Sequence, residues 1–131
     1  MSKASLSIVD IVRDPLWLAD RYDPEYDSFH FRYVNRDQHR AATFLTAEYL
    51  GEAVEPIVIR RADAMAAKPQ QGPMHFIFHS AFCCSTLLAR AMDIPGLAMG
   101  LKEPLILNDI VGWRQRGGDP QMIAQVLDDS L

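Results

Sequence analysis

Two adjacent hydroxyl residues, Ser85 and Thr86, stand where an apolar segment gives way to a helical pattern. The segment 74–78 is apolar on both faces except at His75, which is typical of a central parallel strand. The first N–H groups of a helix lack helical partners and lie at the positive end of its dipole. Strand, loop and helix therefore predict a site for a phosphate or sulfate group beside the two hydroxyls. The helical pattern after the loop consists of Leu87, Leu88, Ala91 and Met92.

The loop differs from the nucleotide-triphosphate loop G-x-x-x-x-G-K-[ST]. When Ser85 takes the hydroxyl position, the two glycines are replaced by Phe78 and Cys83, and the lysine by Cys84. The loop lysine is therefore absent, and no carboxylate stands out as a magnesium ligand. An ATP-dependent kinase remains an alternative hypothesis, supported only by the succession of a strand, a loop and a helix.

Residues 82–86, which read Phe-Cys-Cys-Ser-Thr, resemble the phosphosulfate-binding loop of the sulfotransferases, where a basic residue is followed by Ser, Gly, Ser or Thr, and Thr. Residues 87–90, Leu-Leu-Ala-Arg, also resemble many bacterial members. The resemblance implies a P-loop-like fold that binds the 5′-phosphosulfate of 3′-phosphoadenosine 5′-phosphosulfate without a metal ion. Arg90 lies one helical turn after the loop hydroxyls and is a further candidate for contact with this anion. The residues implied to bind the phosphosulfate are Cys83, Cys84, Ser85 and Thr86.

The loop departs from the family pattern at two sensitive positions. Phe82 stands where sulfotransferases have a lysine or arginine, and Cys84 stands where they have a glycine. The second change adds a side chain where the backbone approaches the ligand closely. These departures support a second hypothesis: a degenerate or truncated P-loop-like domain that binds an anion or serves as an interaction module, without catalysis.

A charged pair closed by proline, Lys102-Glu103-Pro104, follows the short apolar segment 97–101. The pattern predicts a second parallel strand, whose carboxyl end would lie in the crevice where open α/β proteins bind ligands. The resemblance implies that Glu103 accepts the proton of the attacking hydroxyl, with Lys102 in place of the missing loop cation. His79, just before the loop, is a third candidate, as a base or as a hydrogen-bond partner of the anion. The alternative for Lys102 and Glu103 is a charged pair that only solvates the end of the strand. The alternative for His79 is a structural side chain that hydrogen-bonds to nearby backbone.

The expected fold class is α/β, a P-loop-like three-layer parallel sheet with flanking helices, preceded by a small α+β cap. Residues 1–72 are expected to form the cap and a linker, and residues 73–131 the start of the sulfotransferase-like domain. The resemblance reaches Leu131 without the later elements that bind the nucleotide's 3′-phosphate, so we expect an incomplete sheet and a longer parent protein. The patterns predict helices near 7–18, 36–50, 108–116 and 121–131, strands at 29–33 and 57–60, and a linker at 66–73.

Charge and hydropathy narrow the choice of partners. A formal net charge of −4 argues against a general nucleic-acid surface, and no apolar run approaches the roughly 20 residues that span a bilayer.

The chain reaches acidic Asp10 before a continuous apolar core forms, so export is not indicated and a cytoplasmic location is expected. The expected acceptor is a hydroxyl or amine of a small molecule, glycan or peptide, and an unpaired sheet edge would favour homo-oligomers.

Cys83 and Cys84 are adjacent, which does not suit a loop-closing disulfide or a zinc site. One hypothesis is a redox switch, in which a vicinal disulfide closes the anion loop. The alternative is two small residues that fit a crowded turn.

Overall fold

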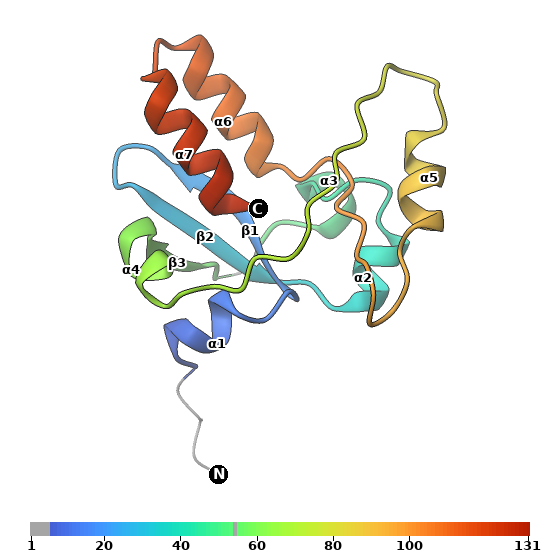
Figure 1. The fold of residues 1–131 in the computed structure, drawn as a ribbon, viewed down its shortest axis with the longest axis horizontal. Helices are drawn as coiled ribbons and strands as arrows, with labels where there is room; N and C mark the ends of the chain where they lie inside the picture. Colours follow the sequence, from blue (N-terminus) through green and yellow to red (C-terminus); the bar gives the residue numbers. More distant parts are fainter. Residues whose placement is uncertain (1–5, 54) are drawn as a thin grey trace.

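The computed structural model describes residues 6–53 and 55–131, a mixed α/β structure with a three-stranded antiparallel sheet in the order β1-β2-β3. Figure 1 shows α6 and α7 side by side against the sheet, and α5 at the other side of the molecule, beyond α2. The first residues of the chain, which bear on the export prediction, lie outside the described ranges. The strands are β1 (Trp17–Asp23), β2 (Ser28–Tyr33) and β3 (Ile57–Arg60), and the helices are α1 (Ile8–Val12), α2 (Arg36–Ala41), α3 (Ala47–Leu50), α4 (Arg61–Ala66), α5 (Ser85–Ala91), α6 (Ile106–Gln115) and α7 (Pro120–Ser130).

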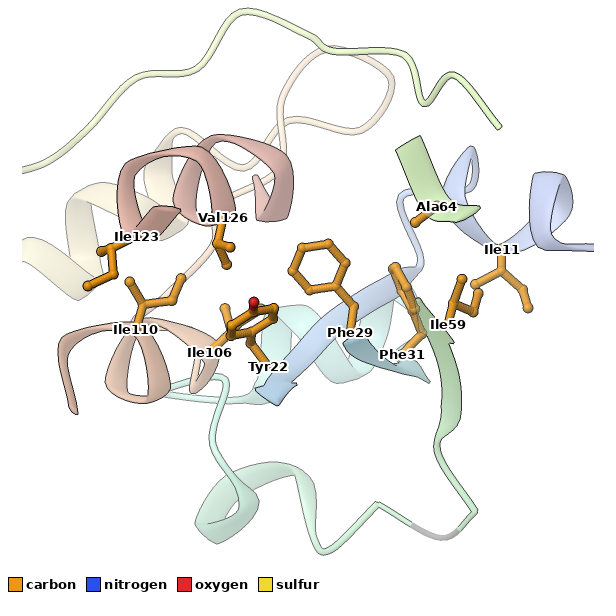
Figure 2. Packing of buried hydrophobic residues seen from close by; sticks show 10 residues of the cluster. All are labelled: Ile11, Tyr22, Phe29, Phe31, Ile59, Ala64, Ile106, Ile110, Ile123 and Val126. Carbon is orange, nitrogen blue, oxygen red and sulfur yellow. The ribbon is translucent and has the colours of Figure 1, made fainter. Parts of the chain in front are cut away.

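An apolar core joins the sheet to α6 and α7 (Figure 2). Phe29 and Phe31 alternate with polar residues along β2 and are buried, which confirms the predicted strand. Ile123 and Val126 of α7 pack on the same core, at the helical spacing predicted for the end of the chain. This core therefore draws on residues from both sides of the predicted boundary at residue 72. Its other buried members are Ile11, Tyr22, Ile59, Ala64, Ile106 and Ile110.

Local capping explains where the first and last helices begin. The Ser7 hydroxyl accepts a hydrogen bond from the Asp10 N–H at 3.2 Å, and the Asp10 carboxylate accepts one from the Ser7 N–H at 3.0 Å. This reciprocal pair is a capping box. Before α7, the Asp119 carboxylate accepts from the Met122 N–H at 3.0 Å, and Pro120 takes the first helical position, where its missing N–H costs nothing.

The strand β1 lies partly where the sequence pattern predicts a helix. The observed helix in this region, α1, ends at Val12, and Trp17 pairs with Tyr33 of β2. The two rings meet edge to face with centroids 5.6 Å apart, a contact that stabilises paired strands. The prediction of helix as far as residue 18 was wrong, because cross-strand pairing outweighs the local pattern.

The helix predicted over residues 36–50 is divided into α2 and α3. The backbone turns extended at Ala42, with ψ of 133°. The N–H of the fully buried Leu45 then donates to the Lys102 carbonyl at 2.7 Å, and its carbonyl accepts from the Leu105 N–H at 3.1 Å. These two long-range bonds take the place of helical ones, so the prediction of one continuous helix was wrong.

The described residues contain no parallel strand pair, so the predicted parallel sheet is not shown. The segment 74–78 lies outside the sheet, and its residues Phe76 and Phe78 are 62% and 94% exposed. The segment 97–101 forms no strand either, since its β contact is an isolated antiparallel bridge between Ile94 and Ala98. A strand is held in place by ladder hydrogen bonds. Neither segment has a neighbouring strand among the described residues to supply them.

Candidate functional site

The predicted anion loop leads directly into α5. The prediction of a helix with Ser85 and Thr86 in its first turn is confirmed. The loop turns through two residues with left-handed backbone, Phe82 and Cys84, each with φ of 60°. This conformation favours glycine and costs other residues about 1–3 kcal/mol. Cys84 thus adopts the backbone that the glycine of the resembling loop would take most easily.

The first turn of α5 carries both predicted hydroxyls. Ser85 and Thr86 are each half-buried. The Cys84 side chain, at the N-cap position, makes no capping hydrogen bond with the described residues. The first turn therefore has two hydroxyls nearby but no cap from its own N-cap side chain.

Two of the candidate residues, His79 and Glu103, meet beside this loop. The His79 Nε2 lies 3.4 Å from the Glu103 Oε1, and the His79 Nδ1 lies 3.3 Å from the Ser80 carbonyl oxygen. The Ser80 carbonyl oxygen can only accept a hydrogen bond, so Nδ1 is the donor in that contact and Nε2 faces the carboxylate. The side chains are 31% and 52% exposed, so the pair is open to solvent.

The backbone around Glu103 is fixed by packing behind it. Glu103 itself has a left-handed φ of 47°. The residues that flank it are held by the two backbone bonds to Leu45 described above, and Leu45 belongs to a second apolar cluster. The carboxylate that contacts His79 therefore projects from a backbone segment that is hydrogen-bonded to the buried Leu45. The buried residues of this cluster are Leu18, Val34, Ala42 and Leu45.

Lys102, the proposed replacement for the loop cation, lies buried behind the site with 6% exposure. Its ammonium donates to the Ala42 carbonyl and, at 3.3 Å, to the Arg40 carbonyl. These carbonyls lie at the carboxyl end of α2, where a positive charge also interacts favourably with the helix dipole. Burial lowers the pKa of Lys102, the positive charge of Arg90 lowers it further, and Asp93 opposes them. In this conformation Lys102 stabilises the support of Glu103 and its ammonium is already engaged.

The segment before Lys102 approaches α5 closely at Gly100. A Cβ added there would lie 2.7 Å from the Ala89 carbonyl oxygen, which a side chain could not tolerate. This contact brings Lys102 into the electrostatic range of Arg90, whose own side chain is exposed. The segment 100–102 thus lies beside the second half of α5, at Ala89 and Arg90.

Three residues that the sequence patterns did not single out also hold this region together. Arg36 donates to the Asp93 carboxylate and, at 2.8 Å, to the Ala98 carbonyl, which ties α2 to the chain after α5. His39 is buried beside them, with no hydrogen-bond partner for its ring nitrogens among the described residues. Arg36 and His39 lie three positions apart on α2, whereas Asp93 follows α5, so their proximity depends on tertiary packing and has no local signal.

Comparisons with protein-family models, with curated proteins and with solved structures gave no match. In residues 6–53 and 55–131, no cluster of three or more His, Cys, Asp and Glu side chains has the geometry to hold a metal ion. Every helix in the same ranges is too short or too polar to cross a bilayer.

Proposed function

We propose that the loop 80–84 and the first turn of α5 bind the 5′-phosphosulfate of 3′-phosphoadenosine 5′-phosphosulfate, as part of a sulfotransferase-like protein. The observation that carries the proposal is the contact between His79 and Glu103, at 3.4 Å, beside a loop that resembles the phosphosulfate loop. Binding would use Ser85, Thr86 and the N–H groups at the start of the helix. The proposed fold of the sulfotransferase-like protein is P-loop-like; the segments 74–78 and 97–101, which are not strands in this structure, would pair there as neighbouring parallel strands.

The proposed reaction transfers a sulfuryl group to a hydroxyl or amine. The acceptor oxygen or nitrogen attacks the sulfur, and the bond from sulfur to the bridging phosphate oxygen breaks. Its electron pair leaves with adenosine 3′,5′-bisphosphate, and the Glu103 carboxylate takes the acceptor's proton. His79 would orient this carboxylate, while hydrogen-bond donors of the loop stabilise the charge that develops on the phosphosulfate.

Binding can be tested directly by amide NMR titration of this chain with adenosine 3′,5′-bisphosphate, and with ATP and magnesium as the comparison. We expect saturable shifts with the bisphosphate, centred on Cys84, Ser85 and Thr86. The double variant Ser85→Ala, Thr86→Ala should abolish them. Thr46→Ala is the matched control, since Thr46 is a hydroxyl residue at the N-cap of α3 and makes no side-chain cap hydrogen bond there. Shifts with ATP alone would favour the kinase alternative.

A second candidate function is a non-catalytic interaction module. The observation that favours it is a pair of exposed rings, Phe76 and Phe78, whose centroids lie 6.3 Å apart, in the segment that leads to the fully exposed Phe82. Soluble proteins that expose adjoining large apolar side chains often use them in contacts with other proteins. A spectrum that ignores both nucleotides would support this candidate and contradict the sulfotransferase-like one.

A further inference from the structure

We propose that Cys83 and Cys84 form a reversible thiol–disulfide site that changes the start of α5. Both cysteines are free and exposed, and they are the two cysteines of the chain. They occupy the last two positions before Ser85, so any bond between them acts on the loop and on the helix start together. The proposal concerns thiol chemistry, which is independent of the sulfuryl transfer proposed above.

Adjacency decides what kind of disulfide this pair can form. Consecutive Cα atoms lie about 3.8 Å apart, whereas disulfides usually join Cα atoms about 4.4–6.8 Å apart. A bond between Cys83 and Cys84 would therefore be strained. Strained and exposed disulfides are the more easily reduced ones, and they serve as labile or regulatory bonds rather than structural ones.

The backbone of the pair is the part that must change. The disulfide closes a small ring that contains the peptide bond between the two residues, so it constrains the torsions on both sides. Cys84 now has φ of 60° and ψ of 23°, and its carbonyl accepts the Leu88 N–H at 3.1 Å as the first bond of α5. A ring that alters these torsions alters the position of that first bond.

The oxidant we propose is a low-molecular-weight disulfide such as glutathione disulfide. The thiolate of one cysteine attacks a sulfur of the oxidant, forms a mixed disulfide and releases one glutathione thiolate. The neighbouring thiol loses its proton to solvent and displaces the second glutathione. The bond between the Sγ atoms of Cys83 and Cys84 forms as the oxidant disulfide is reduced to two thiols.

The test uses the whole chain in glutathione buffers of increasing oxidised fraction, followed by acid quenching, alkylation and mass spectrometry. We expect a product that is two hydrogen atoms lighter, carries no adduct and reverts with dithiothreitol. Its amide shifts should be concentrated in residues 82–88. Cys83→Ser and Cys84→Ser should each stop at the mixed disulfide. A wild-type chain that accumulates only glutathione adducts or intermolecular disulfides, or a ring product whose α5 amides stay unchanged, would overturn the proposal.

One consequence rests on the proposed function: the oxidised chain should bind adenosine 3′,5′-bisphosphate about tenfold more weakly, a difference of about 1.4 kcal/mol. Titration of both redox forms separates the two proposals. If neither form binds, the proposed function fails, while mass and amide shifts still decide the thiol site. If both forms bind equally, the proposed function stands and the effect of the disulfide on the anion loop is contradicted.

Discussion

The buried ammonium of Lys102 donates a hydrogen bond to the main-chain carbonyl of Ala42, at the end of α2. The bond joins residues distant in sequence, and it lies directly behind the carboxylate proposed as the base. Lys102 therefore has a measurable structural role that is separate from any contact with substrate.

We expect Lys102→Met to lower the free energy of unfolding by about 2 kcal/mol, because it leaves the carbonyls of Arg40 and Ala42 without their donor. Urea unfolding followed by tryptophan fluorescence measures the change. Lys68→Met is the matched control, since the Lys68 side chain is exposed. Equal stability of the two variants would contradict the structural role of Lys102.

Half-buried Arg61 forms charged contacts with two segments that are distant in the sequence. Its Nε lies 2.7 Å from an Asp27 oxygen and one of its terminal nitrogens lies 2.7 Å from an Asp129 oxygen, so it links the β1–β2 turn to α7. Its hydrogen bond lowers the pKa of Asp27, although burial opposes this. Arg61→Met should cost about 2 kcal/mol of stability at neutral pH.

The contact between Arg61 and Asp27 also predicts how the stability of the fold changes with pH. The pKa of Asp27 is lower in the folded chain than in the unfolded chain. The stability that Asp27 contributes is therefore complete above its pKa in the unfolded chain, and it is lost as the pH falls through its pKa in the folded chain. The stability difference between wild type and Arg61→Met should therefore shrink in acid. Arg60→Met, at an exposed neighbouring position, is the control and should show neither effect.

Local sequence patterns predicted the elements whose signals lie within a few residues. The alternation of Phe29 and Phe31 predicted β2, and the change of period after Ser80 predicted a helix with Ser85 in its first turn, which is α5. The apolar spacing of Ile123 and Val126 gave α7. In each case the burial pattern or the helix start follows from the segment itself.

The same patterns failed where distant segments decide the structure. The bonds of Leu45 to Lys102 and Leu105 interrupt the helix predicted over 36–50. The apolar segment 74–78 has the composition of a buried strand, but a parallel strand also needs a neighbour to pair with. In the site, both His79 and Glu103 were named from the sequence, but the engagement of Lys102 by α2 depends on tertiary packing and has no local signal.

The buried His39 predicts a loss of stability at mildly acidic pH. Burial lowers its pKa below the ordinary 6.5; the charge of Arg36 and, more weakly, Lys102 act in the same direction, and Asp93 opposes them. The unfolded chain therefore takes up the proton more readily, and stability should fall as the pH drops through about 6.5. Urea midpoints at about pH 7.5 and about pH 5.5 measure this difference.

The histidine responsible can be identified by substitution. His39→Leu removes the titrating group without leaving a broken hydrogen bond among the described residues, so it should flatten the pH dependence. His75→Gln is the control, because His75 is exposed, and it should keep the wild-type slope. A His39→Leu chain that loses stability in acid as steeply as wild type would refute the assignment.

The exposed apolar surface at Phe78 and Phe82 predicts self-association. Both side chains lie almost entirely in solvent, and burying a phenylalanine typically gains about 1.5–3 kcal/mol. Sedimentation velocity should show a mean mass that rises with concentration, and Phe78→Ser with Phe82→Ser should suppress the rise. Tyr26→Ser removes another exposed aromatic ring, 69% exposed in the β1–β2 turn, and should leave the association unchanged. Equal suppression by Tyr26→Ser would mean that general surface hydrophobicity, not this surface, drives the contact.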